Sequence, residues 1–327
     1  MRSKCRKIHS DKTVGKLKSR LISLPYSEPE FNNQFLRVMG SQKQRLMRFD
    51  SKENITSPLI NYINGLRKTS FVQSHQVRGP KIRLFGGSTI DCQEVPDDYT
   101  IASQLQKLIN CSPPHLSHFE VINYGISGAT LNASFNEFNQ FDIFKGDVCL
   151  FYFGANEGSF PKEFFKAKKQ LSWIPALRQA LDLFRKYQLI SLYRIFEKIM
   201  TFDENHPLLI QKVNDVDTML SSIASRCRSE GAQFVAILQP LLHTREPLSQ
   251  FDVTNRWHNP KVRYKAQLFL FKRIVERLTT KSFFIDGRKI FNQTNLDVYI
   301  DWCHTNYLGN KIIADFFFSI IDQQMKD

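Results

Sequence analysis

The stretch Lys81-Ile-Arg-Leu-Phe-Gly-Gly-Ser-Thr-Ile90 decides the fold of this chain. Its apolar residues predict a buried strand, which Gly86-Gly87 then ends. Ser88 follows directly, at the point where a parallel strand passes into its helix. Open α/β sheets bind their ligands there, outside the carboxyl ends of the strands. We therefore expect Ser88 to face a substrate, although a tight turn or a phosphate-binding loop would also fit this stretch alone.

Four further apolar stretches downstream predict strands, each closed by a polar or Gly-containing turn. They are residues 119–124, 147–153, 234–238 and 283–285. Helical spacing predicts helices between and after them, at Ile101–Ile109 and Asn306–Gln323. Strands that alternate with helices indicate βαβ units and a parallel sheet covered on both faces.

The chain divides into an N-terminal extension, residues 1–79, and a larger unit, residues 80–327. The extension is basic, and we expect it to be partly disordered, above all in its Ser-rich residues 1–30. The pattern at residues 58–66 suggests a short helix within it. Within the larger unit, residues 158–230 form a predicted helical insertion whose apolar stripe at 189–199 indicates core packing, with a lid or a partner surface as the alternative.

Charge is concentrated at one end of the chain. The net charge is +14, and residues 1–80 carry 16 Lys and Arg against 5 Asp and Glu. Such a basic arm can contact an anionic membrane surface or simply maintain solubility. No nucleic-acid-binding motif accompanies the charge, so we do not expect a nucleic acid partner.

Composition places the chain among ordinary globular proteins. It has 327 residues, of which 42% are hydrophobic and 23% charged, enough to build one large core. We see no signal peptide and no apolar run long enough for a transmembrane helix. The 6 cysteines lack metal-ligand spacing, which favours reduced thiols, no metal and no cofactor. We therefore expect a cytoplasmic protein, with peripheral membrane attachment through the basic arm as an option.

Polar and Gly-rich segments at the strand ends supply the parts of a nucleophilic site. Acyl transfer by serine needs an imidazole base, a carboxylate to orient it, and donors for the oxyanion. His304 and Asp301 lie three residues apart, so they can reach Ser88 together. Gly125 offers a backbone N–H without an intervening Cβ, and Asn156 offers a side-chain amide. We expect Cys303 to be buried and to point away from His304.

These segments resemble, in order, the four conserved blocks of the SGNH (GDSL-type) hydrolase superfamily. The matching segments are Gly-Gly-Ser-Thr at 86–89, Asn-Tyr-Gly-Ile-Ser-Gly at 123–128, Gly-Ala-Asn-Glu at 154–157 and Asp-Trp-Cys-His at 301–304. The resemblance covers about residues 80–325 and implies a three-layer α/β/α sandwich with a mainly parallel, about five-stranded flavodoxin-like sheet. Two positions depart from the family pattern: Gly87 stands where Gly-Asp-Ser has Asp, and Glu157 stands where Asp is usual.

The resemblance implies a serine esterase or deacylase acting through an acyl-serine intermediate. It makes Ser88 the nucleophile, His304 the base and Asp301 the orienting acid. Ser88, Gly125 and Asn156 would then form the oxyanion hole. The substrate would be an acylated small molecule or glycan, or a lipid. Two alternatives stay open: a carbohydrate O-acyltransferase on the same fold, and a non-catalytic protein that binds membrane surfaces. The oligomeric state is left open.

Overall fold

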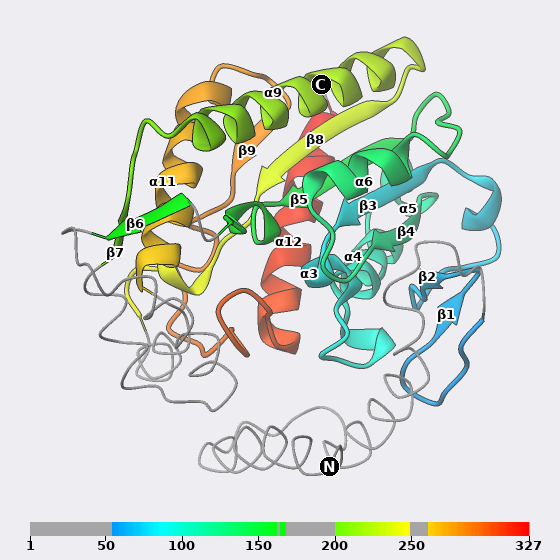
Figure 1. Cartoon of the computed structure of the whole chain (residues 1–327). Coiled ribbons are helices and arrows are strands. Elements are labelled where there is room, and N and C mark those ends of the chain that lie inside the picture. Colours follow the sequence, from blue (N-terminus) through cyan, green and yellow to red (C-terminus); the bar gives the residue numbers. More distant parts are fainter. Residues whose placement is uncertain (1–53, 162–163, 168–199, 249–260, 327) are drawn as a thin grey trace.

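A parallel sheet forms the centre of the molecule. The computed structural model describes residues 54–161, 164–167, 200–248 and 261–326 (Figure 1). The strands of this sheet are β3 (Lys81–Gly86), β4 (Glu120–Gly125), β5 (Val148–Phe153), β8 (Gln233–Leu238) and β9 (Phe284–Asp286). They pair in parallel in the order β4-β3-β5-β8-β9. Numbered along the chain this order is 2-1-3-4-5, the doubly wound flavodoxin-like arrangement, so the predicted fold class is confirmed.

Helices cover both faces of the sheet and complete the three layers (Figure 1). One core contains apolar residues of α6 (Leu131–Phe138), α9 (Pro207–Ser229) and α11 (Lys261–Leu278). The other contains those of α3 (Ser88–Asp91), α4 (Ile101–Asn110) and α12 (Tyr307–Gln324). Shorter helical turns are α5 (Pro114–Ser117), η1 (Gln76–Arg78), η2 (Asp97–Tyr99), η3 (Asn156–Gly158) and η5 (Leu242–Thr244).

The central strand β5 shows why the sequence of this sheet is so apolar. All of its residues, Val-Cys-Leu-Phe-Tyr-Phe, are buried. A strand between two helical layers has no solvent-facing side, so polar alternation is lost. Phe151 stacks on Phe85 of the neighbouring strand, with ring centroids 4.7 Å apart. This packing fixes the register of β3, whose carboxyl end carries Ser88.

Residues 58–66 are not a helix, so that prediction is wrong. The strands β1 (Tyr62–Ile63) and β2 (Leu66–Arg67) form an antiparallel hairpin, and β2 pairs with the edge strand β4. Within the described residues the sheet therefore has seven strands, five of them parallel. Asn64 and Gly65 have φ angles of 52° and 79°, the positive values that a two-residue hairpin turn of type I′ requires. The Asn-Gly dipeptide was the sequence signal for this hairpin.

The described parts of segment 158–230 contain strands as well as a helix. Strands β6 (Phe165–Ala167) and β7 (Met200–Phe202) pair antiparallel. Helix α9 is the crossover between β5 and β8 and packs on β8. The predicted apolar stripe at 189–199 and the basic residues 1–30 lie outside the described residues. Within the described ranges, no helix is long and apolar enough to cross a membrane.

Candidate active site

Ser88 is the first residue of α3, immediately after the carboxyl end of β3. The two preceding glycines make this position possible, because both are in close contact with neighbouring segments. A Cβ on Gly86 would lie 2.7 Å from the Tyr152 carbonyl oxygen, and one on Gly87 would lie 2.8 Å from Asn156 Nδ2. Side chains there would push β3 away from β5 and from the Asn156 loop. The Gly-Gly pair thus brings Ser88 to the carboxyl edge of the sheet.

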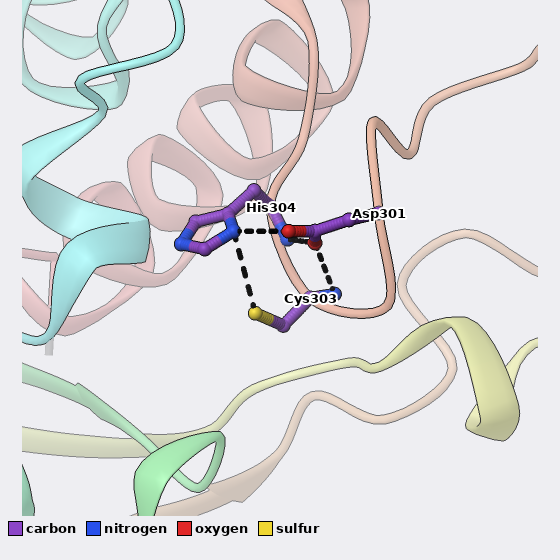
Figure 2. A group of neighbouring side chains, drawn as sticks. All are labelled: Asp301, Cys303 and His304. Atoms are coloured by element: carbon purple, nitrogen blue, oxygen red, sulfur yellow. Dashed lines mark hydrogen bonds and ion pairs between the residues drawn. The ribbon is translucent and has the colours of Figure 1, made fainter. Parts of the chain in front are cut away.

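A tight loop before α12 carries Asp301 and His304. Asn306 caps α12, since its side-chain oxygen accepts the N–H groups of Leu308 and Gly309 at 3.0 and 3.1 Å. Asp301 closes the loop: its Oδ1 accepts the N–H groups of Cys303 and His304 at 2.8 and 2.7 Å (Figure 2). These bonds leave Asp301 Oδ2 directed at the imidazole ring.

The three residues expected to form a triad come together. His304 Nδ1 lies 2.7 Å from Asp301 Oδ2, and His304 Nε2 lies 2.7 Å from Ser88 Oγ. Both distances are within the range of strong hydrogen bonds. Ser88 and His304 are part-buried, so a substrate can reach them. The arrangement can move a proton from the serine to the imidazole while the carboxylate fixes the ring tautomer.

The electrostatics favour an ionised Asp301 beside a basic His304. Burial alone would raise the pKa of Asp301, but its hydrogen bonds to His304 and to the loop N–H groups lower it below the usual value. Burial alone would lower the pKa of His304, but Asp301, Cys303 and Glu94 outweigh burial and raise it. The carboxylate at Nδ1 would thus stabilise the imidazolium that forms when Nε2 takes the proton of the Ser88 hydroxyl.

Asn156 lies on the loop after β5, close to Gly87, the residue before Ser88. Its Nδ2 donates to the Ala129 carbonyl at 2.7 Å, which leaves its second amide hydrogen for a ligand. Glu157 holds this loop in place. Its buried carboxylate accepts the Gly154 N–H at 2.7 Å and also the Leu131 N–H. Glu157, which departs from the family pattern, therefore positions the loop and does not face the substrate.

Gly125 differs from the expected geometry. Its N–H donates to the side-chain oxygen of Asn123 at 2.8 Å, so it is committed within the protein. A Cβ at this position would collide with the backbone N–H of Asp91 in α3. The glycine is needed because β4 and α3 approach each other closely. Its N–H would reach an oxyanion only by exchanging the bond to Asn123.

Cys303 is buried as predicted, with 4% of its surface exposed, but it does not point away from His304. Its Sγ lies 3.6 Å from His304 Nδ1 (Figure 2). Burial is the main cause that raises the pKa of this thiol to about 12, so it is a poor nucleophile at neutral pH. The ligating atoms of Asp301, Cys303 and His304 lie within 4.8 Å of one another. However, both ring nitrogens already have partners in Asp301 and Ser88, as proton transfer requires.

Glu94 is a site residue that the sequence did not reveal. Its Oε1 lies 3.5 Å from His304 Nε2, on the same side of the ring as Ser88. Burial raises the pKa of this carboxyl to about 7, partly offset by the charge of His304. It lies on the irregular segment after α3, where no periodicity or known motif marks it.

Comparisons with known proteins found a matching family model and similar solved structures. The model of the GDSL-like Lipase/Acylhydrolase family matches residues 82–317. No curated protein matches the chain. Among solved structures, the acetylxylan esterase Axe2 from Geobacillus stearothermophilus is similar over 74% of this chain and 93% of its own, with 17% identity and a TM-score of 0.40. LAE5, an alpha/beta hydrolase enzyme from the metagenome of Lake Arreo in Spain, is similar over 74% of this chain and 94% of its own. Its sequence identity is 15% and its TM-score is 0.42.

Proposed function

The chain belongs to the GDSL-like lipase/acylhydrolase family, an ester-hydrolysing family, and we propose that it acts through an acyl-serine intermediate on Ser88. The observation that supports this most strongly is the pair of 2.7 Å contacts that joins Ser88, His304 and Asp301. Ser88 lies near the start of the range that the family model matches, and Asp301 and His304 lie near its end. The contacts give the serine hydroxyl a proton acceptor and give the imidazole a carboxylate to orient it.

In the first half of the reaction, Ser88 Oγ attacks the ester carbonyl carbon while His304 Nε2 takes the hydroxyl proton. The bond from the carbonyl carbon to the leaving oxygen then breaks, and Nε2 returns the proton to that oxygen. In the second half, water replaces the alcohol and the same steps release the acid and free Ser88. Asp301 stabilises the imidazolium that forms twice in each cycle.

The oxyanion donors that we propose are the Ser88 N–H and the Asn156 side chain. The Ser88 N–H belongs to the first residue of α3, where a helical N–H has no carbonyl partner within the helix. Gly125 would join them by exchanging its bond to Asn123. Gly128, with φ of 78°, lies on the exposed turn after β4. Its neighbour Ala129 borders Gly87, which places this turn beside the nucleophile.

The acyl group that we propose is small, such as acetyl, on a carbohydrate or lipid alcohol. Transfer to a sugar hydroxyl would use the same acyl-serine, with the sugar in the place of water. Product analysis separates the two reactions, since a transferase yields a new ester when an acceptor sugar is supplied and a hydrolase yields free acid.

Short-chain p-nitrophenyl esters test the proposal. The wild type should release p-nitrophenol with turnover, whereas Ser88→Ala and His304→Ala should be nearly inactive. Ser127→Ala is a matched control, because Ser127 lies on the neighbouring loop and is part-buried like Ser88. Full activity of the Ser88→Ala variant would contradict the mechanism.

A further inference from the structure

Glu94 occupies the side of His304 on which the leaving group must lie. Nε2 delivers its proton to the leaving oxygen, so the two atoms must come within hydrogen-bond distance. Since Glu94 Oε1 is 3.5 Å from Nε2, the leaving oxygen comes to within about 6 Å of this carboxylate, as hydrogen-bond lengths dictate. Groups attached to that oxygen therefore meet the charge of Glu94.

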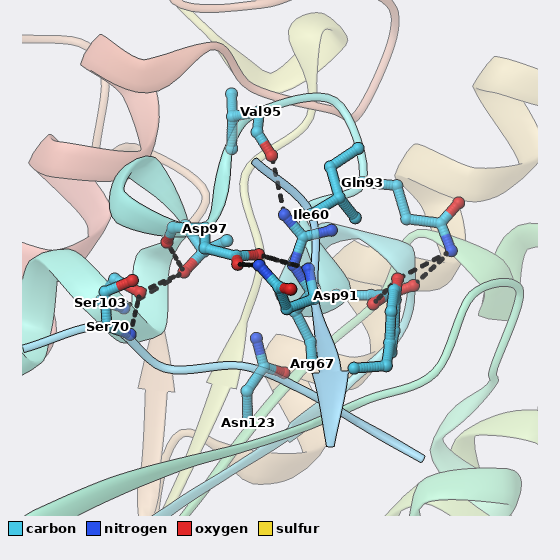
Figure 3. Close-up of polar contacts among 12 residues, drawn as sticks. Ile60, Arg67, Ser70, Asp91, Gln93, Val95, Asp97, Ser103 and Asn123 are labelled. Carbon is cyan, nitrogen blue, oxygen red and sulfur yellow. Dashed lines mark hydrogen bonds and ion pairs between the residues drawn. The ribbon is translucent and has the colours of Figure 1, made fainter. Parts of the chain in front are cut away.

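The segment that carries Glu94 is held from its other side. Asp91 accepts the Tyr62 hydroxyl at 2.8 Å and the Gln93 side-chain amide at 2.6 Å. Two residues after Gln93, the carbonyl of Val95 accepts a hydrogen bond from the guanidinium group of Arg67 at 2.8 Å (Figure 3).

Asp97 also holds this segment in place, through contacts with Arg67 and Asn61. It forms an ion pair with Arg67 at 3.0 Å and accepts the Asn61 side-chain amide at 2.6 Å. Positions 91, 93, 95 and 97 are thus tied to this buried network, whereas Glu94 lies between them and faces His304.

The hairpin at the edge of the sheet supplies the two central side chains of this network. Tyr62 and Arg67 lie in β1 and β2, and Arg67 is buried to 1% exposure. Both precede residue 82, where the match to the family model begins. A charged side chain that deeply buried is costly unless it is paired, so the hairpin and the Glu94 segment keep each other in place.

We propose that Glu94 sets the charge preference of the leaving-group side of the site. Its carboxylate favours alcohols that carry hydroxyl donors or a positive charge and disfavours anionic ones. The inference rests on the proposed serine esterase function, because it assumes that Nε2 protonates the leaving oxygen.

Several titratable groups, charged and neutral, lie near Glu94 or its partners. The groups that act on it or on its partners are His304, Asp301, Asp91, Arg67, Cys92 and Cys303. His304 serves every substrate in the same way, so its titration cancels in a ratio of two substrates. Such a ratio therefore reports the charge of Glu94 itself.

Phenyl acetates with different 4-substituents test the proposal with the acyl group held constant. The substituents are trimethylammonium, carboxylate and, as a neutral reference, carboxamide. The measured quantity is the ratio of kcat/KM for the cationic over the anionic ester, in wild type and in Glu94→Gln. Differences in intrinsic reactivity cancel between the two proteins. The charge of a 4-substituent lies across the ring from the leaving oxygen, within about 10 Å of Glu94. One carboxylate at about 10 Å changes such a ratio by about tenfold or more, and we expect the ratio to fall by that factor in Glu94→Gln.

The matched control is Glu230→Gln, which removes the same charge from an exposed residue at the end of α9, before the amino end of β8. It should keep the wild-type ratio. In the wild type, the ratio should fall as the pH is lowered from about 8 to 6, because protonation removes the charge of Glu94, whose pKa is raised by burial.

The two proposals fail in different ways. A ratio that is the same in wild type and Glu94→Gln, or equally changed in Glu230→Gln, overturns the role of Glu94. Ser88→Ala tests the esterase mechanism on all three esters at once. Retained activity in that variant overturns the mechanism whatever the ratio shows.

Discussion

His304 Nε2 lies 2.7 Å from Ser88 Oγ, although 216 positions of sequence separate the two residues. Ser88 is placed by the turn after β3, and His304 by the capped loop before α12. Both elements belong to the same face of the sheet, where α3 and α12 share one core. The contact therefore depends on the packed fold and not on any local segment.

Asp301→Asn should lower kcat by about 10³–10⁴-fold, the loss that follows when an orienting carboxylate is replaced by its amide. The asparagine can present its NH₂ to Nδ1 and stabilise the wrong ring tautomer. Steady-state kinetics with a p-nitrophenyl ester measures the effect. Asp315→Asn is the control, because the side chain of Asp315 on α12 is 44% exposed and pairs with Lys311. Comparable losses in the two variants would contradict a role for Asp301 in orienting the base.

Asn156→Ala and Glu157→Gln should affect different properties. Loss of an oxyanion donor costs about 10²–10³ in kcat, so Asn156→Ala should reduce turnover with little change in Tm. Glu157→Gln weakens two buried hydrogen bonds and should lower the free energy of unfolding by about 1–3 kcal/mol. Urea denaturation and kinetics on both variants check this division. A stable, fully active Asn156→Ala protein would exclude the amide from the oxyanion hole.

Arg67→Met should lower the free energy of unfolding by about 3–5 kcal/mol, the usual cost of removing one partner from a buried ion pair. Asp97 would keep its charge at a buried site without its cation. Lys68→Met is the neighbouring control, since Lys68 is exposed and surface changes of this kind usually stay within about 0.5 kcal/mol. Equal stability of the two variants in urea would show that the hairpin is not anchored as described.

Stability should depend on pH through His304. The pKa of His304 is raised in the folded protein despite its burial, chiefly by Asp301. Its contribution is therefore complete below the unfolded value of about 6.5 and declines as the pH rises toward the folded value. The difference in unfolding free energy between wild type and His304→Gln should be larger at pH 6 than at pH 9. A difference that grows with pH would contradict the raised pKa.

The sequence was sufficient for the parallel sheet and for singling out the three residues that the structure brings together. The central strand β5 is a continuous apolar run, and such runs are typical of strands buried on both faces. Ser88 belongs to one short motif, and Asp301 and His304 belong to another. Each motif lies within a single short segment of the chain. These signals are local, so they can be recognised without the fold.

Glu94 and the hairpin could not be recognised in the same way. Glu94 acquires its role from a contact with His304, which is distant in the sequence, and from anchors on neighbouring positions. The hairpin had a local signal in Asn64-Gly65, but its strands are only two residues long, too short for a periodic pattern. Its importance comes from Arg67, whose burial only the packed structure reveals.

Labelling with a fluorophosphonate tests the central claim most directly. The activated Ser88 Oγ should displace fluoride and form one covalent phosphonyl adduct per chain. Mass spectrometry of the digested protein should find this adduct on the peptide that contains Ser88, and Ser88→Ala should remain unlabelled. His304→Ala should react much more slowly, since the serine loses its base. A wild-type protein that hydrolyses esters without acquiring the adduct, or a Ser88→Ala variant labelled as fully as wild type, would contradict the account.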